Sequence, residues 1–93
     1  MGIQQTSLDA FEQIRHELGE RQILVYQAFK KHGLKTNLEL SVLLEIPINQ
    51  VTPRTNELVK KGFIKEKGRR PCSISGRNAI IWGVHNQHNH RLE

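Results

Sequence analysis

The chain has 93 residues, with 37% hydrophobic and 25% charged residues, which is the composition of one globular domain and excludes a disordered chain. No apolar run approaches the ~18 residues that a membrane-spanning helix needs. The first residues, MGIQQTSLDAFEQ, lack the basic and apolar regions of a secretory signal. The single cysteine, Cys72, excludes an internal disulfide and fits a reducing compartment. Together these features predict a cytoplasmic protein that does not contact membranes.

Positive charge is concentrated in the second half of the chain. The formal net charge is +5 and the pI is about 9.8. Residues 1–50 contain five Lys or Arg and six Asp or Glu, a net charge of −1, whereas residues 51–93 contain nine and three, a net charge of +6. One strongly basic half indicates an anionic partner such as nucleic acid, although a basic face that only confers solubility would look the same.

Two helices are expected in the first third of the chain. A partial capping box, Thr6 to Asp9, precedes apolar residues at helical spacing, and together they predict an N-terminal helical extension over residues 1–19. Its apolar stripe is Leu8, Phe11, Ile14 and Leu18. A second helix is expected over residues 20–32, because basic residues at its end and the following Gly33 favour a helix C-terminus.

Two shorter helices follow, separated by a tight turn. Thr36 or Asn37 can cap a short helix over residues 38–45, which Pro47 ends. A further helix is expected over about residues 50–61, with Asn49 as its N-cap and Pro53 in its first turn.

The hydrophobic period then changes from 3.6 to 2, which predicts strands over residues 63–67 and 79–84. The intervening residues, 68–78, contain three arginines and are expected to form a basic hairpin loop, and residues 85–93 are expected to form a flexible tail. The expected core consists of Ile23, Leu24, Phe29, Leu38, Val42, Leu43, Val51, Leu58, Ile64, Ile81 and Trp82.

The order of helix, short helix, turn, helix and basic hairpin matches a helix-turn-helix followed by a wing. Leu58, Gly62 and Ile64 occupy an "xLxxxGxI" pattern, and residues 69–82 resemble the wing of small uncharacterised bacterial, phage and prophage proteins. Residues 20–84 therefore resemble the winged helix-turn-helix superfamily. The resemblance implies an α+β fold, with a three-helix core and a two-stranded β-hairpin wing, to which this chain adds an N-terminal helix.

The resemblance also implies that the helix of residues 50–61 enters the major groove of duplex DNA and that the wing, residues 68–78, contacts the backbone or minor groove. Amide, hydroxyl, guanidinium and carboxylate groups can read base edges, while fixed positive charge meets phosphates. We expect Arg54 and the pair Arg69–Arg70 to lie on one side of the domain. The candidate DNA-binding residues are Asn49, Gln50, Thr52, Arg54, Asn56, Glu57, Lys60, Lys61, Arg69, Arg70 and Arg77.

The rival function is a protein-interaction module, because winged helices also serve that purpose. No catalytic set, metal site or cofactor motif is evident, and Cys72 with His85, His88 and His90 matches no zinc spacing. The N-terminal apolar stripe could form a homodimer contact or pack on its own domain, and the sequence favours neither.

Overall fold

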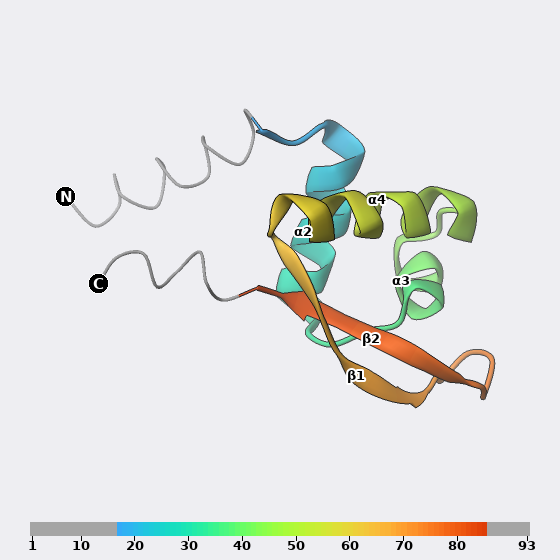
Figure 1. Ribbon diagram of the computed structural model, residues 1–93. Coiled ribbons are helices and arrows are strands. Elements are labelled where there is room, and N and C mark those ends of the chain that lie inside the picture. The colour runs from blue at the N-terminus through green and yellow to red at the C-terminus, as the bar shows by residue number, and fades with distance from the viewer. Residues whose placement is uncertain (1–16, 86–93) are drawn as a thin grey trace, which may run out of the picture.

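The computed structural model describes residues 17–85, so the predictions for most of the N-terminal extension and for the tail lie outside the described residues. The elements in chain order are α2 (Glu20–His32), α3 (Asn37–Leu44), α4 (Ile48–Lys61), β1 (Ile64–Pro71) and β2 (Asn78–Val84) (Figure 1). No helix within the described part of the chain is long and apolar enough to cross a membrane.

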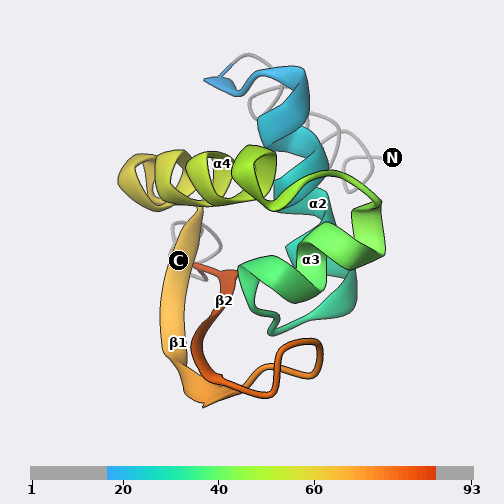
Figure 2. The same ribbon diagram turned by 90° about the vertical axis from the view of Figure 1, so that its right-hand side faces the viewer.

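The three helices form a small bundle from which the hairpin projects. α4 packs on both α2 and α3, and β1 with β2 makes a two-stranded antiparallel sheet that contacts α2 and α4 (Figure 2). The residues after α2 lie along the free edge of β2, because Lys35 and Trp82 exchange two backbone hydrogen bonds of 3.2 and 2.9 Å. This arrangement is a winged helix, as expected.

Both ends of α3 are capped. Thr36 Oγ1 accepts a 3.1 Å bond from the Glu39 N–H, and Glu39 Oε1 accepts a 3.0 Å bond from the Thr36 N–H, which together make a capping box. The helix ends at Leu44, and the C-cap residue Glu45 has a φ of 59°, the left-handed conformation that usually favours glycine. The prediction of a short helix is confirmed, with bounds one residue earlier.

α4 begins two residues earlier than expected, and this corrects the assignment of its N-terminus. The Pro47 carbonyl accepts the N–H groups of Gln50 at 2.9 Å and Val51 at 3.3 Å, so the helix begins directly after this proline. Asn49 is therefore inside the first turn and is not the N-cap. Pro53 consequently lies in the second turn, where it has no N–H to donate to the Asn49 carbonyl.

The hairpin strands are longer than predicted, and the connecting turn is correspondingly shorter. β1 continues past residue 67 through an irregularity between Glu66 and Gly68, and the φ of 134° at Gly68 suits only glycine. Arg69 pairs with Ile80 and Arg70 with Ala79, so both arginines belong to β1 and not to the loop. Because successive strand residues alternate, their side chains leave opposite faces of the hairpin.

The core lies between the helices and the first half of the hairpin. Five expected core residues are buried, namely Phe29, Val51, Leu58, Ile64 and Ile81, while Ile23, Leu38 and Trp82 are half-buried. Three expectations are wrong, because Leu24, Val42 and Leu43 are 38%, 53% and 41% exposed. α3 is apolar around most of its surface, so spacing could not identify its inner face, which is occupied by the fully buried Leu40.

Candidate nucleic-acid interface

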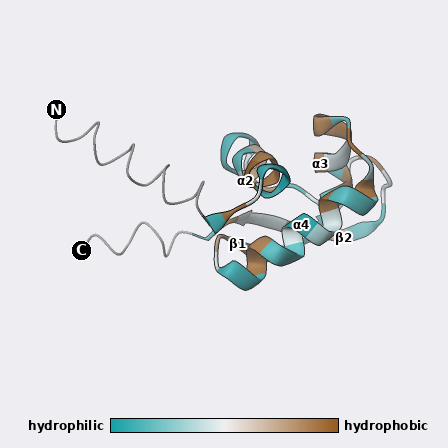
Figure 3. Ribbon diagram, turned by 90° about the horizontal axis from the view of Figure 1, so that it is seen from above, coloured by the Kyte–Doolittle hydropathy of each residue, from teal (hydrophilic) through white to brown (hydrophobic). Residues whose placement is uncertain are grey.

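The outward face of α4 is set by its buried stripe. Val51, Thr55 and Leu58 are all 0% exposed, and the Thr55 hydroxyl donates to Asn37 Oδ1 at 2.8 Å, which satisfies its buried polar group. Opposite this stripe, helical geometry places a row of exposed polar residues along the whole helix. Figure 3 shows α4 as a succession of hydrophilic and hydrophobic segments, as a helix with one inner face requires. The row consists of Asn49, Asn56 and Lys60, with exposed Gln50 beside it.

Arg54 and Glu57 lie on the flank of α4 that faces α2. Arg54 Nε donates to Glu57 Oε1 at 2.8 Å and Arg54 Nη2 donates to Oε2 at 2.9 Å. Gln22 Nε2 also donates to Glu57 Oε1, at 2.7 Å. The Arg54 guanidinium, and next the Gln22 amide, lower the pKa of Glu57 to about 2. Arg54 and Glu57, two of the predicted DNA-binding residues, are thus already bonded within the domain. The sequence did not identify Gln22 as a partner of Glu57.

The other predicted DNA-binding residues of α4 differ in whether their side chains are free to contact a ligand. Lys61 Nζ donates to the Glu17 carbonyl at 2.7 Å, which fastens the segment before α2 to the end of α4. Thr52 is half-buried beside the inner stripe, and Lys60 is exposed.

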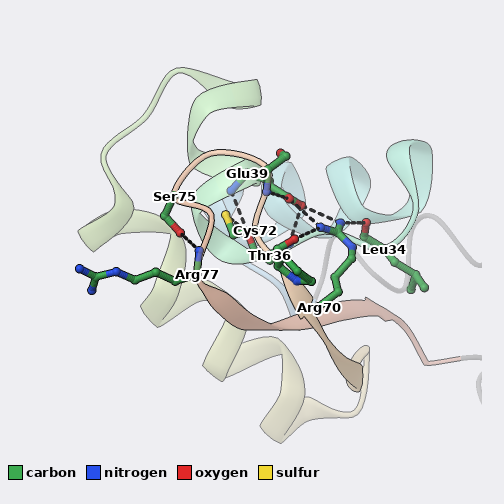
Figure 4. Close-up of polar contacts among 9 residues, drawn as sticks. Leu34, Thr36, Glu39, Arg70, Cys72, Ser75 and Arg77 are labelled. Carbon is green, nitrogen blue, oxygen red and sulfur yellow. Dashed lines mark hydrogen bonds and ion pairs between the residues drawn. The ribbon is translucent and has the colours of Figure 1, made fainter.

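Exposed cationic side chains lie along the hairpin. Arg69 and Arg77 are exposed, and the Arg77 side chain points away from the neighbouring polar contacts (Figure 4). Lys65 and Lys67 on β1 are also exposed. They were not selected from the sequence because they were assigned to a strand and not to the basic loop, although a projecting two-stranded ribbon exposes most of its side chains. The burial pattern of β1 shows this directly, since only its first residue, Ile64, is buried.

Arg70 differs from the other wing cations because it forms a bidentate ion pair with α3. Arg70 Nη1 donates to Glu39 Oε2 and Arg70 Nη2 donates to Oε1, both at 2.8 Å. The same guanidinium donates to the carbonyls of Pro71 at 3.1 Å and Leu34 at 3.2 Å (Figure 4). Its charge is therefore directed into the domain.

Glu39 collects contacts from three segments and is only 5% exposed. Besides Arg70 and its own capping bond, it accepts the Ser73 N–H at 2.7 Å. The Arg70 guanidinium is the main reason that the pKa of Glu39 lies well below its usual range, against the opposing effect of burial; the Ser73 and Thr36 N–H groups lower it further. Cys72 Sγ lies 3.2 Å from the Thr36 hydroxyl. We call Thr36, Glu39, Arg70, Cys72 and Ser73 the Glu39 cluster.

The described residues contain neither an unpaired buried polar side chain nor a candidate metal site. Within residues 17–85, every buried side-chain nitrogen and oxygen has a hydrogen-bond partner. The same residues contain no group of three or more His, Cys, Asp or Glu side chains that could hold a metal ion.

Arg54 and Arg70 are each paired with a carboxylate of the domain, at well-separated places. The Arg54 pair bonds to Gln22 in the first turn of α2, whereas Arg70 bonds to Leu34 just beyond the end of that helix. The 13 residues of α2 span about 20 Å, so the Arg54–Glu57 pair lies near the start of this helix and the Arg70 guanidinium lies near its end. Each is held by a carboxylate that the sequence analysis did not pair with it.

Comparison with known proteins identifies the fold alone. No family model and no curated protein sequence matches the chain. A possible transcriptional regulator from Methanosarcina mazei Go1 is similar in structure, with a TM-score of 0.64 and 15% identity over 82% of this chain and 63% of that one. The reduced form of MarR from E. coli has a TM-score of 0.60 and 19% identity, covering 87% of this chain and 62% of MarR.

A cysteine-to-serine mutant of MarR from E. coli has a TM-score of 0.59 and 19% identity, covering 81% of this chain and 52% of that one. The chain therefore spans between half and two thirds of the length of these structures.

Proposed function

We propose that the chain binds double-stranded DNA without catalysis, as a small cytoplasmic transcriptional or phage-encoded regulator. α4 enters the major groove, and the hairpin meets the adjacent backbone or minor groove. The observation that carries this proposal is the exposed polar row of α4 beside a hairpin with four exposed cations. Similarity to a possible transcriptional regulator supports the same function.

The exposed row supplies groups suited to reading bases. The side-chain amides of Asn49, Gln50 and Asn56 can each donate to and accept from the edge of an adenine. Lys60, at the C-terminal end of the row, carries a flexible point charge and suits a phosphate. Thr52, half-buried at the edge of the row, is a further predicted DNA contact on this helix.

The hairpin supplies the sequence-independent contacts. Lys65, Lys67, Arg69 and Arg77 can neutralise phosphates and release counterions, which gives affinity that falls steeply with salt. Arg54, Glu57 and Lys61 remain predicted DNA contacts, and each would first have to leave its present partner.

Titration of a random-sequence duplex at several salt concentrations tests this function. We expect tight binding at low salt, a linear fall of log affinity with log salt, and a slope reduced by about 0.9 for each phosphate contact removed in Arg69→Ala or Arg77→Ala. Asn56→Ala should leave that slope unchanged and weaken the preference for selected sequences over random ones. Absence of duplex binding by the wild-type chain at low salt would contradict the proposal.

A protein-interaction module is the second candidate, and one observation favours it. Val42, Leu43 and Ile48 on α3 and the start of α4 are 53%, 41% and 40% exposed. Exposed apolar residues near one another in the chain are common at protein interfaces. The same titration separates the two functions, because this candidate predicts no salt-dependent affinity for duplex DNA.

A further inference from the structure

We infer that Glu39 and Arg70 are positioning residues that hold the wing on α3, so that a buried acidic residue promotes DNA binding. This inference rests on the proposed function, since the wing positioned in this way is the one that carries Arg69 and Arg77. It assigns Arg70 a different role from the phosphate contact expected from the sequence.

The Glu39 carboxylate joins three parts of the chain. Its two oxygens accept both arms of the Arg70 fork from β1, the Ser73 N–H from the wing turn and the Thr36 N–H at the start of α3. Planar bidentate pairing fixes orientation as well as distance. The Cys72 contact with Thr36 adds a second attachment of the turn to the same point (Figure 4).

The wing needs such an attachment. A two-stranded hairpin is at best marginally stable alone, and the end of this one extends beyond the buried part of β1. Its turn is closed internally by 2.8 Å bonds from the Cys72 N–H to the Arg77 carbonyl and from the Gly76 N–H to the Cys72 carbonyl. Only the Glu39 cluster connects this closed turn to the helices by polar contacts within residues 17–85.

Loss of the attachment would lower affinity for DNA, because the wing would have to be ordered during binding. Arg69 is adjacent to Arg70 in β1, and Arg77 ends the turn that contains Ser73. Ordering mobile cations on binding is unfavourable, and a preorganised wing avoids that cost.

The two roles of Arg70 predict opposite effects of removing the Glu39 charge. If Arg70 contacts phosphate, Glu39 competes with DNA for it, and Glu39→Gln should strengthen binding by releasing Arg70 and removing a negative charge near a polyanion. If Arg70 anchors the wing through Glu39, the same substitution should weaken binding.

The variants can be matched closely. Glu39→Gln preserves side-chain shape and the capping box, in which Gln serves as well as Glu. Arg70→Lys preserves charge but not the fork, which Glu39 requires and a phosphate does not. Glu66→Gln is the control: it makes the same charge change at an exposed position of β1 that forms no ion pair within residues 17–85.

We expect Glu39→Gln, Arg70→Gln and the double variant each to weaken duplex binding by about tenfold, without additivity, because all three break one contact. Arg70→Lys should not restore affinity, and Glu66→Gln should bind as tightly as wild type or more tightly. Tighter binding by Glu39→Gln, additive losses in the double variant, or wild-type affinity in Arg70→Lys would overturn the inference. All affinities are measured well below the unfolding temperature of every variant.

Amide hydrogen exchange distinguishes failure of this inference from failure of the proposed function. Without DNA, Glu39→Gln should accelerate exchange at the Ser73 and Gly76 amides and leave exchange in the middle of α2 and α4 unchanged. Unchanged exchange in the turn would show that Glu39 does not hold the wing. A wild-type chain that binds no duplex, with faster exchange in the variant, would instead overturn the proposed function and leave the attachment established.

Discussion

Two carboxylates, Glu39 and Glu57, each hold one guanidinium group, yet their surroundings differ. The Glu39 side chain is 5% exposed and its partner Arg70 is 36% exposed, whereas Glu57 and Arg54 are 39% and 29% exposed. Water and salt screen the second pair more strongly, so its contribution to stability is the smaller one. The first pair contributes more, because a buried carboxylate that loses its partner has no access to solvent.

Both pairs make stability depend on pH, and the sign follows from the pKa values. The pKa of Glu57 is lowered to about 2 and that of Glu39 is lowered still further, whereas both titrate at about 4.3 when the chain is unfolded. Their stabilising effect is therefore complete above about pH 5 and is lost as the pH falls through the folded-state values. Urea unfolding between pH 6 and 2 should show a decreasing free energy of unfolding.

Glu39→Gln should have a flatter pH profile, because it removes one of the titrating carboxylates. Glu66→Gln serves as the control and should retain the wild-type profile. A wild-type free energy of unfolding that stays constant over this range would contradict the assignment.

At the scale of the elements, α3 shows how an almost uniformly apolar helix selects one face. Leu40 is 0% exposed, and Leu43 is 41% exposed although it lies only three residues further along the helix. Thr36 and Glu39 are bonded within the Glu39 cluster, which fixes the orientation of the first turn. Leu40 belongs to the same core as Val51 and Leu58 of α4, and Asn37 of α3 accepts a hydrogen bond from Thr55 of α4.

Leu40→Ala should destabilise the domain by about 2–5 kcal/mol, because it creates a cavity in the core. Leu43→Ala removes the same atoms from the same helix, and we expect a change below about 1 kcal/mol, since most surface substitutions have small effects. Urea unfolding of the two variants provides the comparison. Equal destabilisation would mean that the face of α3 is assigned wrongly.

At the scale of the whole molecule, the open question is what covers the N-terminal apolar stripe. Its last member, Leu18, is buried in the core of the domain, and Lys61 bonds to the carbonyl of Glu17. The end of this segment is therefore attached to the same domain, while Leu8 and Phe11 lie outside the described residues. A homodimer formed through that stripe remains a prediction.

Sedimentation of the full chain tests the dimer. If the stripe forms the contact, the wild-type mass should be twice that of one chain, and Leu8→Asp with Phe11→Asp should halve it, because buried apolar surface drives such association. Point substitutions are preferable to a truncation at residue 20, which would also remove Leu18 from the core. An unchanged mass with a lowered unfolding temperature would show that the stripe packs on its own domain.

The sequence predicted the elements and their order well, because each has a local cause. Gly33 and Gly62 end the helices of residues 20–32 and 48–61, and the change of hydrophobic period marks the hairpin. It was less successful with the start of α4 and the length of β1. Pro47 accepts two helical bonds where Asn49 was expected to begin the helix, and an irregularity at Gly68 carries the strand past its expected end.

By itself the sequence determined an α+β chain with a polar-faced helix, a basic hairpin and charges of opposite sign at known positions, because periodicity, caps and composition are local properties. Only the tertiary structure decided which charges remain available. Arg54 with Glu57 is a local pair, but its contact with Gln22 and the pairing of Arg70 with Glu39 join residues more than 30 positions apart. Such pairs form only when packing brings distant segments together, so of two arginines adjacent in the sequence Arg70 is paired with a buried carboxylate and Arg69 is exposed.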